Sequence, residues 1–414
     1  MDKVILNNGI ETIIKTNKNT PRTAIAFYIR FNKMNISKSG MYYLLASLMF
    51  QGTKNRTGEE LAIELNENAI EIYFTVKSDY LVFKILCLNE DVERALEIFQ
   101  DILENTTFDS VEKEAQKIKG ELEAEMDSSR KQAQDEFYRT IYKNHYYSYG
   151  MKEAIEQIGS ITKQELFEIF YQLKFVTAKN IFVVSDKSKE DILPLIEKHL
   201  ASLSVKDTEY RENKNEAITQ DRISTVVKED ANQAQIYMGW HAPYMENFRE
   251  FISFMLMNNV LGSSGLSSRL FLELREKKGL AYTVRSVYET FRLGSCFYVY
   301  IATEPKNIKT AIDGFKTEID KIMTELISDE ELESAKNRAI GRKQFAYETN
   351  MSEATTRGLY QYLGFDLNYD EKIENMIKDI TKEDIMNTAK KYLSGHNALC
   401  VLAPSEYLKE ANLI

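Results

Sequence analysis

The strongest constraint on this chain is that its predicted elements follow one another in the same order twice. Alternating apolar residues around Asn8 and Gly9 predict a hairpin of two short strands over 4–14. Further alternating and continuous apolar segments of the first half predict strands over 23–31, 70–75, 80–88 and 180–184, and helices over 41–50, 91–104, 110–142 and 188–202. The second half predicts strands over 235–238, 298–302 and 398–402, and helices over 248–261, 308–326 and 330–347. Each half therefore combines strands with helices, which predicts an α+β fold built twice on one plan.

The segment between the halves has a different composition. Over residues 205–222, Lys, Asp, Glu, Asn and Thr dominate and apolar periodicity disappears, which is typical of a linker. A chain of 414 residues is also too long for one core. We therefore predict an N-terminal domain over 1–204, a linker over 205–222 and a C-terminal domain over 223–414.

Composition excludes several classes of function. The net charge of −10 argues against nucleic acid, which rewards basic surfaces. The N-terminal apolar run of three residues is far short of a signal peptide core, and nowhere do about 18 apolar residues run together to span a bilayer. The odd set of scattered cysteines, Cys87, Cys296 and Cys400, indicates buried thiols in a reducing compartment. We expect a cytoplasmic protein with no membrane partner.

The segment Gly40 to Thr53, GMYYLLASLMFQGT, carries the first motif. It resembles the zinc helix of the M16 (insulinase-like, pitrilysin) peptidases, whose pattern is G-x-x-H-x-x-E-H-x-x-F-x-G-T. The framework of glycines, Phe and Thr is present, but the two histidine positions hold Tyr43 and Ser47 and the glutamate position holds Ala46.

These replacements remove the chemistry of the motif. A catalytic zinc needs three protein ligands, a water and a base beside that water. Tyr43 and Ser47 are not readily ionised at neutral pH and are poor zinc ligands, and Ala46 cannot accept a proton. We therefore predict that the chain binds no metal.

The resemblance assigns the third zinc ligand to a glutamate about 75 residues further on, with a second glutamate seven residues before it. Glu114 and Glu121 have this spacing, but this pair cannot retain zinc without the histidines. The plainer interpretation is a solvated helix face that also includes Glu112, Glu123 and Glu125. The four histidines are too far apart in sequence to replace the lost ligands, and His145 is expected to be structural.

The second motif covers Leu261 to Tyr282, LGSSGLSSRLFLELREKKGLAY, and is complete. It resembles the M16 second-half signature, in which the residues corresponding to Arg275 and Tyr282 hold the substrate backbone and stabilise charge on the scissile carbonyl. A guanidinium stays charged and offers fixed donors, and a phenol adds one more. Gly279 is expected to end the helix in a left-handed cap, so that Tyr282 begins a strand. The alternative is an ordinary exposed helix end, where the helix dipole favours basic residues.

Together the motifs imply two homologous α/β sandwich domains of the LuxS/MPP-like type, forming half of a clam-shell chamber, with the length of the M16B branch. The resemblance implies a non-catalytic subunit that is inactive alone. It would supply Arg275 and Tyr282 to a homologous partner that has an intact His-x-x-Glu-His motif and carries the zinc. Expected substrates are small peptides, leaders or presequences, and the acidic net charge suggests basic ones. The competing hypothesis is an inactive scaffold or peptide-binding homodimer.

Overall fold

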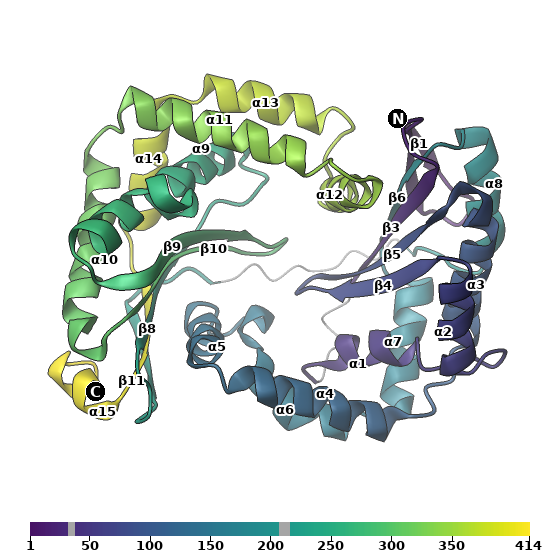
Figure 1. The fold of residues 1–414 in the computed structure, drawn as a ribbon, viewed down its shortest axis with the longest axis horizontal. Coiled ribbons are helices and arrows are strands. Elements are labelled where there is room, and N and C mark those ends of the chain that lie inside the picture. The colour runs from purple at the N-terminus through teal and green to yellow at the C-terminus, as the bar shows by residue number, and fades with distance from the viewer. Residues whose placement is uncertain (32–37, 207–215) are drawn as a thin grey trace. The chain divides into compact units, whose positions relative to one another are not determined.

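Two β-sheets with the same strand order organise the chain (Figure 1). The computed structural model describes residues 1–31, 38–206 and 216–414. Contacts divide them into two units. Unit 1 contains Met1–Leu122, the described part of Glu153–Arg211, and Gln344–Tyr369. Unit 2 contains Glu123–Lys152, the described part of Glu212–Lys343, and Asp370–Ile414.

The sheet of unit 1 has the strand order β1-β2-β6-β3-β5-β4. Its strands are β1 (Asp2–Ile5), β2 (Glu11–Thr16), β3 (Arg22–Arg30), β4 (Glu71–Val76), β5 (Tyr80–Leu88) and β6 (Lys179–Ser185). The pairing of β2 with β6 is parallel, and the other pairings are antiparallel. The expected hairpin around Asn8 and Gly9 is confirmed as β1 and β2, with Gly9 at a φ of +85°.

The sheet of unit 2 has the order β7-β11-β8-β10-β9. Its strands are β7 (Arg222–Val227), β8 (Ala234–His241), β9 (Ala281–Thr290), β10 (Ser295–Thr303) and β11 (Ala398–Ala403). The pairing of β7 with β11 is parallel and corresponds to that of β2 with β6. Apart from the added β1, the two sheets have one topology, so the prediction of a repeated plan is confirmed.

Helices precede, connect and follow these strands. In the first half they are α1 (Met41–Leu48), α2 (Gly58–Glu67), α3 (Val92–Asn105), α4 (Val111–Met126), α5 (Ser129–Ile141), α6 (Met151–Gln157), α7 (Lys163–Phe175) and α8 (Lys189–His199). In the second half they are α9 (Phe248–Asn258), α10 (Ile308–Thr324), α11 (Asp329–Phe345), α12 (Asn350–Tyr362), α13 (Tyr369–Asp379), α14 (Lys382–Leu393) and α15 (Ser405–Glu410). The single helix expected over 110–142 is wrong, because the backbone at Ser128 is extended (ψ 118°) and separates α4 from α5.

One helix of each half belongs to the unit of the other half. Helix α12 packs on β3 and β6 of unit 1, where Met351, Ala354 and Tyr362 bury against Tyr28 and Phe182. Helix α5 packs on β7, β8 and β11 of unit 2. The two units therefore differ from the continuous domains 1–204 and 223–414 by this exchange, and residues 207–215 of the expected linker lie outside the described residues.

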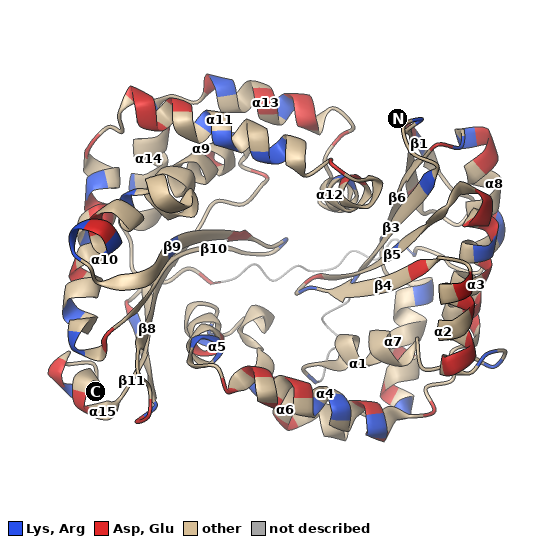
Figure 2. Ribbon diagram, in the orientation of Figure 1, with Lys and Arg blue, Asp and Glu red and all other residues tan. Residues whose placement is uncertain are grey.

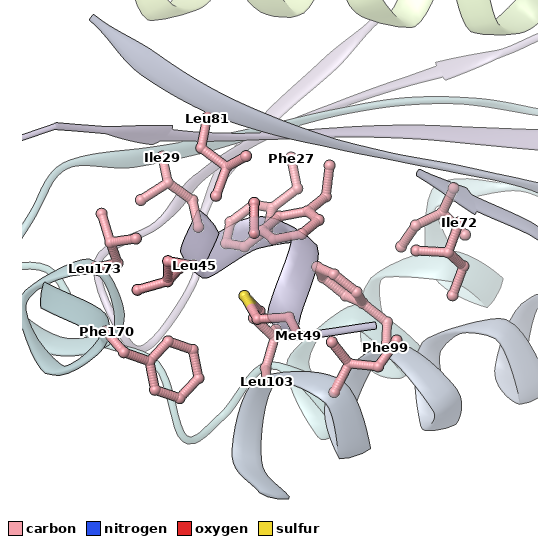
Figure 3. Close-up of a cluster of buried hydrophobic side chains, with 14 of the residues drawn as sticks. Phe27, Ile29, Leu45, Met49, Ile72, Leu81, Phe99, Leu103, Phe170 and Leu173 are labelled. Atoms are coloured by element: carbon pink, nitrogen blue, oxygen red, sulfur yellow. The ribbon is translucent and has the colours of Figure 1, made fainter. Parts of the chain in front are cut away.

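The main core of unit 1 lies on the face of its sheet opposite α12. Side chains from β3 and β5 meet those of α1, α3 and α7 there, and Figure 3 shows Leu45 of α1 and Met49, just after α1, among Phe27, Phe99 and Leu173. Both faces of the sheet are thus covered, which explains why seven consecutive residues of β3 are buried. Figure 2 shows that most charged residues lie on the helices and few on the strands. In the described part of the chain, no helix has the length and apolar character needed to cross a bilayer.

Candidate functional site

Helix α1 carries the first motif and is fixed by the core on one side. Gly40 precedes it at a φ of +81°, and Leu44, Leu45 and Leu48 are buried. Because residues three and four apart share a helix face, positions 43, 46 and 47 lie together. The structure therefore places Tyr43, Ala46 and Ser47, the three positions compared with the zinc pattern, on one stretch of α1.

The side chains at these positions have different environments. Tyr43 is 43% exposed, and its ring meets Phe74 of β4 edge-on at 5.8 Å between centroids. Ala46 is fully buried. The Ser47 hydroxyl donates to Glu114 Oε1 of α4 at 2.6 Å. The motif thus keeps a link between α1 and α4, but as a neutral hydroxyl bound to a carboxylate.

The two glutamates expected on α4 have different surroundings. Glu114 is 4% exposed and also accepts from Lys117 Nζ at 3.2 Å, while Glu121 is exposed. The hydrogen bond and charge of Glu114 raise the pKa of Lys117. The expectation of a solvated glutamate face is therefore wrong for Glu114, because the sequence could not reveal its partner Ser47. It holds for the exposed residues Glu112, Glu121, Glu123 and Glu125.

These residues do not fit a catalytic zinc. Ser47 uses its proton to bind Glu114, whose carboxylate is already paired with Lys117, Ala46 has no donor atom, and the Tyr43 ring packs edge-on against Phe74. Within residues 1–31, 38–206 and 216–414, no group of three or more His, Cys, Asp or Glu side chains is arranged to hold a metal.

Two of the histidines, His145 and His241, make structural contacts. His145, 8% exposed, accepts from the Tyr147 amide through Nδ1 and packs against the ring of Tyr146 at 4.1 Å between centroids. Nε2 of His241 lies 3.1 Å from the carbonyl oxygen of Ile141, and burial lowers the His241 pKa to about 4. The structural role expected for His145 agrees with these contacts.

The second motif places Arg275 and Tyr282 together in unit 2. The Arg275 guanidinium lies 4.6 Å from the ring centroids of both Phe271 and Tyr282, and its Nη1 donates to the Tyr282 carbonyl at 2.7 Å. The Tyr282 side chain is 79% exposed. The arginine is thus held between two aromatic rings, with donors beyond the one that it uses here.

The turn between the two residues follows the prediction. The π-helical segment Phe271–Lys277 ends at Gly279, whose φ is +62°. The Gly279 amide donates to the Arg275 carbonyl and the Leu280 amide to the Leu274 carbonyl, at 3.0 and 2.9 Å. This left-handed cap, favoured by glycine, brings Tyr282 back alongside Arg275 at the start of β9.

A third residue of this motif has a structural partner that the sequence did not reveal. Nε and Nη2 of Arg269 donate to the two carboxylate oxygens of Glu331 at 2.7 and 2.8 Å. Glu331 also accepts from the Ser328 amide, and Ser328 Oγ accepts from the Glu331 amide, so that these two residues cap the start of α11. Arg269 therefore joins the motif to α11.

Each of the two motifs lies beside an edge strand of its own sheet. Tyr43 contacts Phe74 of β4, which forms one edge of the sheet of unit 1. Tyr282 is the second residue of β9, the last strand of the sheet of unit 2. An edge strand can pair with an added extended chain through main-chain hydrogen bonds.

Family comparisons agree with both motifs and with the two-sheet fold. Residues 12–155 match the family model described as insulinase (peptidase family M16), and residues 160–339 match the one described as the peptidase M16 inactive domain. Together the two models cover both motifs and most of the chain. The chain belongs to the M16 peptidase family.

Relatives of similar length carry protease names. The chain is 25% identical to an uncharacterized zinc protease of Rickettsia felis, with 90% of this chain and 89% of that protein aligned. It is 23% identical to the uncharacterized zinc protease YmxG of Bacillus subtilis, over 96% of this chain and 97% of that one.

Solved structures show the same fold at lower identity. A peptidase M16 inactive domain protein from Pseudomonas fluorescens superposes with a TM-score of 0.88 and 17% identity, covering 98% of each chain. A protease from Helicobacter pylori gives a TM-score of 0.86 and 20% identity, over 97% of this chain and 99% of that one.

Proposed function

We propose that this chain is the non-zinc subunit of a two-chain M16B peptidase. The observation that carries the proposal is the contrast between its two motifs. Tyr43, Ala46 and Ser47 supply neither ligands nor base, whereas Arg275 is stacked beside an exposed Tyr282. The names of the relatives as zinc proteases support peptidase chemistry in this lineage, and the lack of zinc ligands on α1 is the reason to propose that a partner carries the zinc.

In this role the chain binds peptide and supports the partner's reaction. Arg275 would donate from its remaining N–H groups to the peptide backbone or to the oxyanion that develops on the scissile carbonyl. The Tyr282 hydroxyl would add one directional donor. An unfolded peptide, leader or presequence would pair with β4 or β9 as an added strand.

The partner is a homologous subunit with an intact His-x-x-Glu-His helix, and zinc is bound there. A cytoplasmic location is part of the proposal and is supported by the three cysteines, which are free and buried. The isolated chain could pair with itself, and a stable homodimer that never forms the mixed complex would favour the scaffold hypothesis.

The test is reconstitution with a purified candidate partner. We expect zinc-dependent cleavage of a quenched fluorescent peptide only after the two chains are mixed, and stoichiometric zinc only in the partner. Arg275→Ala should lower kcat by about 100-fold, the cost of removing one oxyanion donor. Lys278→Ala, an exposed basic residue three positions away, should leave kcat within about twofold and serves as the matched control.

Two results would contradict the proposal. Stoichiometric zinc in this chain with chelator-sensitive cleavage by it alone would show that the first motif is not degenerate in function. Equal turnover by the Arg275→Ala and wild-type complexes would show that the second motif is vestigial.

A further inference from the structure

Two arginines of unit 2 lie beside one buried tyrosine, separate from Arg275. In the register of β8, β10 and β9, Tyr237 is opposite Tyr300, and Tyr300 is opposite Arg285. The Arg285 guanidinium carbon is 5.7 Å from the Tyr300 ring centroid, and that of Arg130, in the first turn of α5, is 5.4 Å from it. Arg130 and Arg285 therefore flank the Tyr300 ring from different elements.

Neither arginine has a counter-ion among the described residues. No carboxylate there lies within 4.0 Å of either guanidinium, and Nε of Arg285 is buried without a hydrogen-bond partner. The chain has 63 acidic and 53 basic residues, so carboxylates are not scarce. Removing part of the Arg285 guanidinium from water without a partner is unfavourable, and an anion would offset this cost, while the exposed Arg130 adds a second positive charge beside it.

The surrounding polar groups do not take that role. The Tyr300 hydroxyl donates to Gln235 Oε1 at 2.7 Å, and the Tyr237 hydroxyl donates to the carbonyl of Arg130 at 3.4 Å. Burial raises the pKa of Tyr300, while Arg130 and Arg285 oppose this increase, and no carboxylate contributes. Both guanidiniums therefore place positive charge beside the Tyr300 ring, although the whole chain is acidic.

The pair lies close to the second motif along one strand. Arg285 follows Tyr282 by three residues on β9, which is about 10 Å of strand. On an added strand, a residue opposite Arg285 would have its Cβ about 5 Å away, within reach of a short acidic side chain.

We propose that Arg130 and Arg285 form a carboxylate-binding subsite for peptides held along β9. This inference rests on the proposed peptide-binding function and adds a preference for one carboxylate. A planar guanidinium pairs with a carboxylate through two parallel hydrogen bonds, a geometry that suits this ligand. The carboxylate comes from an Asp or Glu side chain of the peptide or from its C-terminus. Net charge alone suggested basic peptides, whereas this subsite selects a negative group at one position.

Anisotropy titrations with labelled unfolded peptides test this. One peptide carries an internal Glu and an amidated C-terminus, the second carries Gln and a free C-terminus, and the third carries Gln and an amidated C-terminus. We expect one of the first two to bind about tenfold more tightly than the third, as one charge-assisted pair provides. The peptide that gains identifies the source of the carboxylate.

The double variant Arg130→Gln/Arg285→Gln should lose this tenfold advantage. The control Lys309→Gln/Lys316→Gln removes the same charge from exposed positions of α10 and should keep it. Arg130→Gln alone, at an exposed position, should lose most of the advantage with an unchanged circular dichroism spectrum, so that loss of binding is not confused with loss of folding.

The outcomes separate this inference from the proposed function. Equal affinity for all three peptides overturns the subsite but leaves peptide binding intact. An advantage that survives in the arginine variants also overturns it. Failure to bind any peptide overturns both.

Discussion

Gly358 of α12 provides a sharp test of how that helix docks on the sheet of unit 1. A Cβ at this position would lie 2.8 Å from Cε2 of Tyr28 and 3.3 Å from Cβ of Phe182. The Tyr28 ring cannot move away easily, because its hydroxyl donates to the carbonyl of Thr355 at 2.7 Å and its ring packs on Tyr80 and Tyr362. Gly358→Ala should therefore strain the contact between helix and sheet.

Two opposing effects set the magnitude. Alanine stabilises a helix interior by about 1 kcal/mol relative to glycine. Overpacking a core contact costs about 1–3 kcal/mol. Gly358→Ala should thus change the free energy of unfolding by between about zero and 2 kcal/mol, in the destabilising direction. The control is Gly120→Ala in α4, where a Cβ would meet nothing within 4 Å, and it should stabilise by about 1 kcal/mol.

Urea unfolding followed by far-UV circular dichroism measures both variants. The single tryptophan, Trp240 of β8, reports by fluorescence on unit 2 and shows whether the loss is confined to unit 1. We expect the two alanine variants to differ by about 1–3 kcal/mol. If Gly358→Ala stabilises as much as Gly120→Ala does, α12 does not pack on Tyr28 as described.

Three further predictions concern single polar groups. Ser47→Ala should destabilise by about 1–3 kcal/mol, because Glu114 loses a donor while buried, and an unchanged urea midpoint would contradict this. The His241 pKa of about 4 lies below its ordinary 6.5, so between these pH values the unfolded state binds more protons and stability falls on acidification. His241→Gln should weaken the pH dependence of the thermal midpoint in this window. Burial lowers the Lys179 pKa from 10.5 to about 7, so stability should rise with pH from about 7 to 10.5; Lys179→Met should remove this slope, and a flat wild-type profile would refute it.

The sequence predicted the strands well, because their patterns are local. Alternation and apolar runs located β3, β5, β6 and β10 to within a few residues, and glycines at turns located the first hairpin and the cap at Gly279. Helix α2, strand β7 and the helices from α12 to α15 were not predicted.

The sequence named candidate site residues but did not predict their contacts. Motif spacing singled out Tyr43, Ser47, Arg275 and Tyr282 as candidates, yet it did not reveal the bond from Ser47 to Glu114 or the stacking of Arg275 on Phe271. The apolar pattern of a helix predicts which of its residues are buried, but not which side chains of other elements they contact. For the same reason, amphipathic α5 and α12 could not be assigned to the sheets that they cover.

The exchange of α5 and α12 sets an order for folding during synthesis. The strand of unit 1 that the ribosome completes last, β6, ends at Ser185, but α12 ends only at Tyr362. At about 5–20 residues per second, the ribosome needs roughly 9–35 s to bridge that interval. Until then Tyr28, Phe182 and their neighbours have no covering helix. A gene fragment that ends at residue 204 would leave this apolar face permanently bare, so the halves of this polypeptide cannot be expressed apart without a risk of aggregation.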